Sequence, residues 1–331
     1  MKPIRVVIVI LFLASCVTAT VLLPTDGWAA SKKLLAMGST QSSSSHYAYF
    51  VAVAKVINAR VPEVNISVVE TGASVDNINR IKKGDLDLGM TTIHLQYQAY
   101  HGLDAWKDKP IKDQYVMWVY QPAPQNFVVR EDSVIKSVYD LAGKPFNPGI
   151  RGSATEKTVE AILDALGIVP NWVRGGTEDA VAAIKYKRVL GYVKSGAGVD
   201  SLDASTLDIA TFTPIRLLGF TDEEIAKVKA KYPYLSPIAI PKGIYKETPA
   251  YKTFAMLIGT VVKKDLPEEL VYKMVKAAVE GFDEQGAAYP AIKGVSLPQL
   301  TLETCNVPLH PGAVRYYKEI GLKVPDALIP K

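Results

Sequence analysis

Short apolar segments alternate with amphipathic helical segments along most of this chain, and that alternation limits the fold more than any other feature. Apolar runs of strand length occur at residues 33–39, 64–70 and 85–92. Segments with helical spacing of apolar residues lie between them, at 47–59 and 71–84. Strands that alternate with helices are typical of parallel sheets covered by helices. We therefore predict an α/β fold.

Two lobes fit the length of the chain, because 331 residues exceed the usual size of one domain. The strand-like runs YVMWVY and FVVRE flank QPAPQN at residues 121–126, whose two prolines make a stiff connector. A proline- and tyrosine-rich stretch at 232–240 is the predicted return crossing. We predict two lobes joined by these crossings. Lobe I would comprise residues 30–121 plus 241–331, and lobe II residues 122–240.

The N-terminal segment has the layout of a secretory signal. Lys2 and Arg5 precede an apolar run, and small residues follow near residue 29. We predict cleavage after Ala29, which makes residues 1–29 a signal peptide and the protein periplasmic. The alternative is lipidation at Cys16, because the preceding Leu-Ala-Ser resembles a bacterial lipobox.

Composition excludes several classes of function. The balance of 48% hydrophobic and 21% charged residues is that of a globular protein. The net charge of +5 is scattered among acidic residues without a basic stripe, so we expect no nucleic-acid partner. Without Cys16, Cys305 is the one remaining thiol, so no disulfide is expected within the chain. We expect a monomer that binds no cofactor, and no metal because His94 and His101 lack ligand spacing.

A serine-rich segment, GSTQSSSSHYAYF at residues 38–50, connects the first predicted strand to the first helix. The first turn of a helix leaves backbone N–H groups unpaired and carries the positive end of the helix dipole. Such a start attracts carboxylate or phosphate, and small hydroxyl residues add donors. The segment therefore predicts an anion site, although one serine would suffice merely to cap the helix.

A second segment, NPGIRGSATEK at residues 147–157, has the same design of strand, small-residue turn and helix start. If both segments face one cleft, they can hold opposite sides of one ligand. Arg151 would strengthen the second site, since a guanidinium binds a carboxylate with two parallel hydrogen bonds. A solvated surface arginine is the competing interpretation.

Several segments together resemble the TAXI family of solute-binding proteins, the extracytoplasmic receptors of one class of TRAP transporters. The resemblance is carried, in the expected order, by residues 38–50, 71–90, 147–167, 240–245 and 307–322, of which HPGAVRYYKE is the most specific part. It implies a two-lobed periplasmic binding protein of the type II kind, with the ligand in the interlobe cleft. Such a receptor delivers a small organic anion to a membrane permease driven by an ion gradient. The ligand class implied is glutamate, 2-oxoglutarate or a C4-dicarboxylate.

Departures from the family pattern affect the ligand most. Ser45 and His46 stand where the family has threonine and tyrosine, and the usual proline is missing after Tyr192. Lys194 could therefore add a cation near the cleft, or it could be a solvated charge at a strand end.

Residues carried over from the resemblance and from helix-start chemistry form the candidate ligand site. Tyr120 and Tyr192 could serve as aromatic walls, although a core role is the commoner fate of a tyrosine. Thr92 is preferred to Thr91 for the cleft-facing end of its strand. The candidate ligand-binding residues are Ser39, Thr40, Ser43, Ser44, Ser45, Ser74, Asn77, Thr92, Tyr120, Gly149, Arg151, Ser153, Ala154, Thr155 and Lys194.

An enzyme is the competing class. Ser133 and Lys136, with Lys194-Ser195-Gly196, imitate two elements of a serine acyltransferase, but the S-x-N element between them is missing. A periplasmic hydrolase or lyase in the same cleft would need a positioned base that the sequence does not reveal. A ligand-presenting sensor is the third alternative. We predict a receptor with no catalytic residues.

Overall fold

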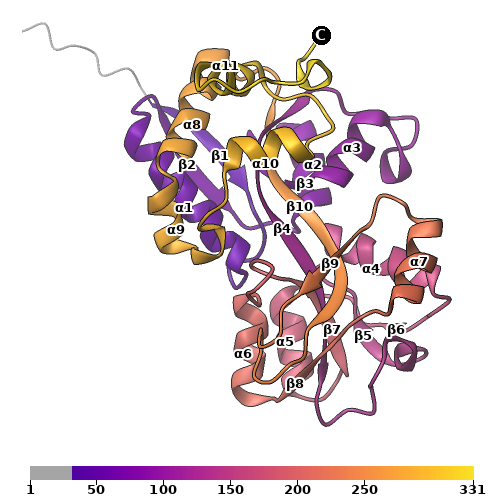
Figure 1. Ribbon diagram of the computed structural model, residues 1–331. Helices are drawn as coiled ribbons and strands as arrows, with labels where there is room; N and C mark the ends of the chain where they lie inside the picture. The colour runs from indigo at the N-terminus through magenta and orange to yellow at the C-terminus, as the bar shows by residue number, and fades with distance from the viewer. Residues whose placement is uncertain (1–31) are drawn as a thin grey trace, which may run out of the picture. The chain divides into compact units, whose positions relative to one another are not determined.

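The computed structural model describes residues 32–331, so the predicted signal peptide and Cys16 lie outside the described residues. Two long antiparallel strands, β4 (Gln114–Arg130) and β10 (Tyr251–Lys263), pass through both strand groups of the fold (Figure 1). We call the strand group in the upper part of Figure 1 lobe I and the group in the lower part lobe II. The fold is the α/β fold of two-lobed periplasmic binding proteins, as expected.

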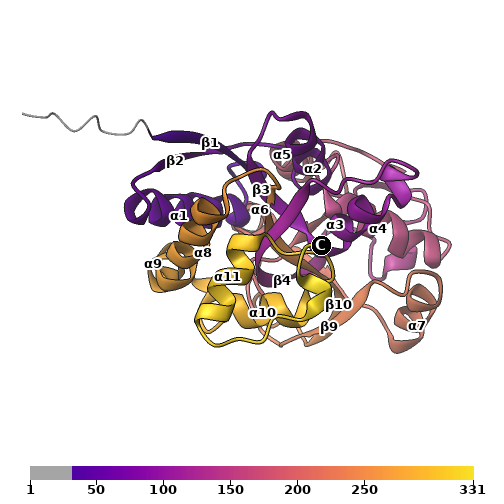
Figure 2. The same ribbon diagram turned by 90° about the horizontal axis from the view of Figure 1, so that it is seen from above.

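Lobe I is built on parallel strands in the order β2-β1-β3, with β10 antiparallel beside β3. Helices cover this sheet, and α8 and α9 lie next to α1 in both views (Figures 1 and 2). Its strands are β1 (Lys33–Gly38), β2 (Val64–Val69) and β3 (Leu88–Thr92). Its helices are α1 (Ser45–Arg60), α2 (Ser74–Lys83), α3 (Ile93–His101), α8 (Glu268–Glu280), α9 (Phe282–Ala288), α10 (Leu297–Thr304) and α11 (Pro311–Glu319).

Lobe II places β7 and β8 beside the second half of β4, with the parallel pairs β5–β7 and β5–β6 further out. Its strands are β5 (Pro145–Asn147), β6 (Asn171–Trp172), β7 (Gly191–Ser195), β8 (Ile215–Leu218) and β9 (Ser236–Ile240). Its helices are α4 (Ala154–Ala165), α5 (Thr177–Lys185), α6 (Ala204–Phe212) and α7 (Asp222–Lys231). Short 3-10 turns at Asp104–Trp106, Val138–Leu141, Pro290–Ile292 and Asp326–Leu328 complete the described residues.

Separate hydrophobic cores support this division. Tyr49, Phe50 and Ile57 of α1 are fully buried in the core of lobe I, at the spacing of one helix face. Phe127 and Phe146 stack in a core of lobe II, with ring centroids 6.2 Å apart. The predicted lobe boundary at 121/122 falls within β4, whereas the one at 240/241 falls at the end of β9, before β10 begins.

The QPAPQN segment is not a connector between two strands, because β4 is one continuous 17-residue strand. Proline lacks an N–H, and Pro122 and Pro124 lie in the stretch that pairs with β10 alone. The predicted return crossing at residues 232–240 is also misplaced. The chain returns to lobe I along β10, at residues 251–263, and β9 only pairs with residues 251–255 of that strand.

The segment DLPEELVYKMVKAAVEGFDEQ, whose apolar residues have the spacing of one amphipathic helix, is divided at Gly281 into α8 and α9. A Cβ at Gly281 would lie 2.3 Å from Val56 Cγ1 of α1, so only glycine allows this close packing.

Candidate functional site

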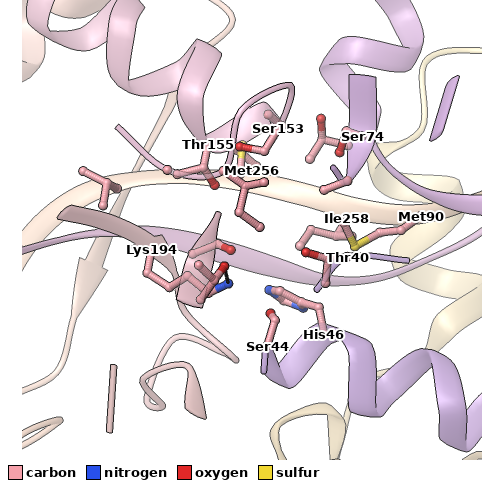
Figure 3. A pocket seen from close by; sticks show the side chains of 18 of the residues that line it. Thr40, Ser44, His46, Ser74, Met90, Ser153, Thr155, Lys194, Met256 and Ile258 are labelled. Atoms are coloured by element: carbon pink, nitrogen blue, oxygen red, sulfur yellow. Dashed lines mark hydrogen bonds between the residues drawn. The ribbon is translucent and has the colours of Figure 1, made fainter. Parts of the chain in front are cut away.

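A cavity lies between the two lobes, where the ends of β1 and β3 face β7 and the start of α4 (Figure 3). Its volume is about 30 Å³, room for about two water molecules. A solute therefore needs the lobes to part before it can enter. The lining residues are Thr40, Ser44, His46, Ala73, Ser74, Met90, Thr92, Asn147, Gly149, Ile150, Ser153, Ala154, Thr155, Thr177, Ala180, Tyr192, Val193, Lys194, Ser195, Met256 and Ile258.

The start of α1, predicted from sequence to bind a small anion, holds a carboxylate of the chain itself. Asp203 comes from lobe II, where it is the N-cap of α6. Its Oδ2 accepts hydrogen bonds from Ser44 Oγ at 3.0 Å and from the Ser45 amide at 2.9 Å. Its Oδ1 accepts from the amide and hydroxyl of Ser205, at 3.0 and 2.6 Å. Four donors from two lobes thus hold one buried carboxylate.

The helix starts of α1 and α6 cap each other across the lobes. While the Ser45 amide donates to Asp203, the Ser45 hydroxyl accepts from the amide of Ala204 at 2.8 Å. A capping box makes such reciprocal bonds within one helix, whereas here they join two helices. We call Ser44, Ser45, Asp203 and Ala204 the interlobe cap.

Lys194, on β7, places its ammonium group beside this carboxylate. Its Nζ is 3.7 Å from Asp203 Oδ1 and donates to Thr177 Oγ1 at 3.4 Å. The two charged side chains are 7% and 0% exposed. Burial lowers the pKa of Lys194, and Asp203 opposes that shift. Burial would raise the pKa of Asp203, but Lys194, His46 and the Ser205 hydrogen bonds together lower it.

His46, the second residue of α1, presents an unpartnered nitrogen to the cavity. Its Nδ1 is 3.0 Å from the hydroxyl of Tyr120, while Nε2 is buried without a hydrogen-bond partner among residues 32–331. Burial lowers the pKa of His46 to about 4, against an opposing effect of Asp203, so the ring is neutral near pH 7. Figure 3 shows the Lys194 side chain extending toward this ring.

The start of α4 supplies the cavity wall from lobe II. Ser153 is the N-cap, and its Oγ accepts from the Glu156 amide at 3.1 Å. Gly149 has φ +112°, and a Cβ there would lie 2.8 Å from Thr155 Cγ2. Gly149, Ser153, Ala154 and Thr155 line the cavity, and the first N–H groups of a helix have no partner within it.

The start of α2 lies opposite, in lobe I. The N-cap is Ala73 with φ +70°, and Ser74 is the first helical residue, although serine is among the residues favoured at an N-cap. The Val75 amide donates to the Gly152 carbonyl across the lobes at 3.1 Å. Thr92, at the end of β3, lines the cavity with an Oγ1 that has no partner among the described residues.

Nine of the fifteen candidate residues line the cavity and six do not. Arg151 is exposed and does not line the cavity. Ser39 and Asn77 are buried and do not line the cavity, and Asn77 Nδ2 donates to the carbonyls of Ser39 and Met90. The cavity-lining nine are Thr40, Ser44, Ser74, Thr92, Gly149, Ser153, Ala154, Thr155 and Lys194. The other six are Ser39, Ser43, Ser45, Asn77, Tyr120 and Arg151.

Sequence reasoning missed two buried residues beside Lys194, Asp203 and His46. Asp203 precedes Ala-Ser-Thr, which is a helix-start signal, but nothing local places it against α1. His46 was noted only as a departure from the TAXI pattern. Tyr192, weighed as an aromatic wall, does line the cavity.

Two further findings concern metal ligands and membrane-spanning helices in residues 32–331. No three His, Cys, Asp or Glu side chains in this range lie close enough together to hold a metal ion. In the same range, no helix has the length and apolarity to cross a bilayer.

Solved structures with the same fold include binding proteins. An ancestral arginine-binding protein bound to arginine superposes with a TM-score of 0.51 at 17% identity, covering 80% of this chain and 99% of its own. A putative L-cystine ABC transporter protein from Listeria monocytogenes gives a TM-score of 0.51 at 13% identity, covering 80% of this chain and 98% of its own. These likenesses establish the fold.

The sequence itself matches one family model over most of its length. The match extends from residue 36 to residue 321 and so includes both lobes and the cavity. The chain belongs to the NMT1-like family.

Proposed function

We propose that this protein is an extracytoplasmic solute-binding receptor that captures a small organic anion and delivers it to a membrane permease. The observation that carries the proposal is the cavity between the lobes. It brings the start of α4 and the Lys194 ammonium together with the unpartnered atoms His46 Nε2 and Thr92 Oγ1. The TAXI resemblance supports the finer proposal of a TRAP-type transporter, and the signal-like N-terminus supports a periplasmic location.

Charge favours an anionic solute. Lys194 is the one Lys, Arg, Asp or Glu among the described residues that line the cavity. An ammonium group has three donors, and the structure gives Lys194 one hydrogen bond, to Thr177. The start of α4 adds the positive end of a helix dipole from the same side. A carboxylate at this point would meet charge-assisted donors on a buried wall.

The mechanism follows from the continuous strands. Because β4 and β10 are the long strands shared by both lobes, their middle segments are where a hinge would bend. β10 carries register irregularities at Ile258/Gly259 and Thr260/Val261, which weaken the ladder locally. A solute that contacts both lobes binds the closed state better and therefore shifts the population toward it.

The side chains near the cavity favour binding over chemistry. The Ser44 hydroxyl donates its hydrogen bond to Asp203, and His46 Nδ1 is bonded to the Tyr120 hydroxyl, so Ser44 and His46 form no nucleophile–base pair in this structure. A hydrolase or lyase using this cleft has no comparable observation in its favour.

Calorimetric titration of the exported protein with small carboxylates tests the proposal. We expect micromolar or tighter binding of at least one compound, without turnover. Lys194→Gln should weaken that binding by about 10- to 100-fold, because it removes a buried cation facing the solute.

Arg151→Gln is the matched control, since Arg151 is exposed and outside the lining, and it should change affinity less than about threefold. Conversion of a bound compound into product by the protein would contradict the receptor proposal. So would equal losses of affinity in Lys194→Gln and Arg151→Gln.

A further inference from the structure

We propose that Asp203 determines which solute charge the protein accepts: its carboxylate fills the anion site at the start of α1, so the lobes close best on a solute with one carboxylate and an uncharged opposite end. The proposal rests on the solute-binding function above and narrows it. It makes Asp203 a specificity-determining residue, although Asp203 is not among the lining residues of the cavity.

The first step is that the site at α1 is occupied when the lobes are closed. Asp203 Oδ2 takes the Ser44 hydroxyl and the Ser45 amide, the donors that a second solute carboxylate would use. The remaining oxygen is bound by Ser205 on the same side of the cleft. Because the Ser45 hydroxyl also accepts from Ala204, the interlobe cap leaves neither Ser44 nor Ser45 without an internal partner.

The second step is the charge balance of the enclosed groups. Lys194 and Asp203 lie 3.7 Å apart, and their charges cancel. His46 is buried and neutral near pH 7, so the side chains around the cavity sum to zero. A monocarboxylate adds one negative charge, which the start of α4 can partly offset with roughly half a positive charge. The Glu156 carboxylate in the first turn of α4 is balanced by Arg174, whereas the first turn of α2 already carries Asp76. A dicarboxylate would add a second negative charge near Asp203, with no cation left to balance it.

The third step is that the opposite end of the solute meets neutral groups. His46 Nε2 and Thr92 Oγ1 are buried, line the cavity and have no partner among residues 32–331. Both can bond an amide, a hydroxyl or a carbonyl. Met90, Met256 and Ile258 complete this wall with apolar contacts (Figure 3).

Calorimetric titration with pairs of equal size that differ by one charge tests the proposal. Suitable pairs are glutamine and glutamate, succinamate and succinate, and 2-oxoglutaramate and 2-oxoglutarate. We expect the wild-type protein to bind the singly charged member at least about tenfold more tightly. D203N should shift this ratio of affinities at least about tenfold toward the doubly charged member, because it removes the negative charge beside Lys194.

D208N is the matched control, since Asp208 lies on the same helix but is 52% exposed and pairs with Lys185. Its selectivity ratio should equal that of the wild type. A wild-type preference for the dianions that D203N leaves unchanged would overturn the proposal, because Asp203 would then move aside for the solute.

A second measurement needs no organic solute. D203G removes the carboxylate, and sodium formate can refill the site, so formate should raise the Tm of D203G at least about 3 °C more than that of the wild type at equal ionic strength. D208G should show no such difference. Where D203G does not fold, D203S provides the comparison, because its hydroxyl can still cap α6.

The two measurements separate the two proposals. If no member of the panel binds the wild-type protein, the receptor function fails while the formate response still decides whether Asp203 fills an anion site. Equal responses to formate in D203G and the wild type would overturn the assignment of that site.

Discussion

The starts of α1 and α4 have similar sequences but different surroundings. Each follows a strand and a turn rich in small residues, and each has serine as its N-cap. The hydroxyl of Ser153 bonds its own helix, whereas that of Ser44 bonds Asp203 of the other lobe. The start of α1 is therefore filled by an internal carboxylate, and that of α4 faces the cavity.

The difference shows that a helix start specifies affinity for an anion but not which anion arrives. The donors of α1 come from adjacent residues, and they would serve a solute equally well. Their occupant is 158 residues away from Ser45 in the chain. Four predictions test how differently the two helix starts, and the residues around them, behave.

Asp203→Ala should have the largest effect, at the α1 start. It leaves Lys194 buried without its counter-ion and Ser44 and Ser45 without an acceptor, so we expect unfolding to become easier by about 3 to 5 kcal/mol. Urea denaturation measures the change. Asp208→Ala removes an exposed ion pair on the same helix and should cost less than about 1 kcal/mol. Equal losses would show that the interlobe cap adds no stability.

The pH dependence of stability should come next, through His46 on the first turn of α1. Its pKa is 6.5 unfolded and about 4 folded, so between these values only the unfolded chain binds the proton. The contribution of His46 to the free energy of unfolding should therefore fall by about 3 kcal/mol as the pH drops from 7 to 4, in addition to that of His94, whose pKa burial also lowers to about 4. Urea titrations at several pH values should show that the free energy of unfolding changes less steeply with pH in His46→Gln than in the wild type. Identical slopes would contradict a buried neutral ring.

At the α4 start, Gly149→Ala should cost about 2 kcal/mol. The residue has φ +112°, and the new Cβ would meet Thr155 Cγ2 at 2.8 Å. Gly152→Ala is the matched control, because its φ of +79° brings strain without a contact within 4 Å. We expect about 1 kcal/mol there, and thermal unfolding compares the two. A Gly149→Ala protein as stable as Gly152→Ala would show that Thr155 can shift.

Ala73→Gly should have the smallest effect, and it should be stabilising. Ala73 caps α2 with φ +70° and ψ −146°, a conformation suited to glycine. We expect a gain of about 1 kcal/mol in the free energy of unfolding, measured in urea. Ala142→Gly, at φ −56° on the surface, should instead lose a few tenths of a kcal/mol. A loss in both variants would mean that the positive φ is not strained.

Local signals predicted the fold well, because each is carried by neighbouring residues. Ser153 begins α4 and Gly84 ends α2, as their sequences indicate. The continuity of β4 was not predictable in this way. β4 can contain Pro122 and Pro124 because, among the described strands, residues 122–124 pair with β10 alone, and that pairing is a tertiary feature. Arg151 shows the same limit: its chemistry suits a carboxylate, but in the folded chain it is exposed and outside the cavity lining.

The interlobe cap was beyond reach for a related reason. Its two halves are a serine pair and an N-cap aspartate, each satisfied by a local explanation. Only the folded chain brings Ser45 and Asp203 within 2.9 Å. Charge pairing between lobes is a tertiary property, and periodicity along the sequence carries no record of it.

Anomalous diffraction from crystals soaked in bromide tests the contrast between the two helix starts most directly. The account predicts a bromide ion at the start of α4 in the wild-type protein and none at the start of α1. In Asp203→Gly, a second bromide should appear between Ser44 and Ser45. Bromide at the start of α1 in the wild type, with Asp203 displaced from Ser45, would contradict the account.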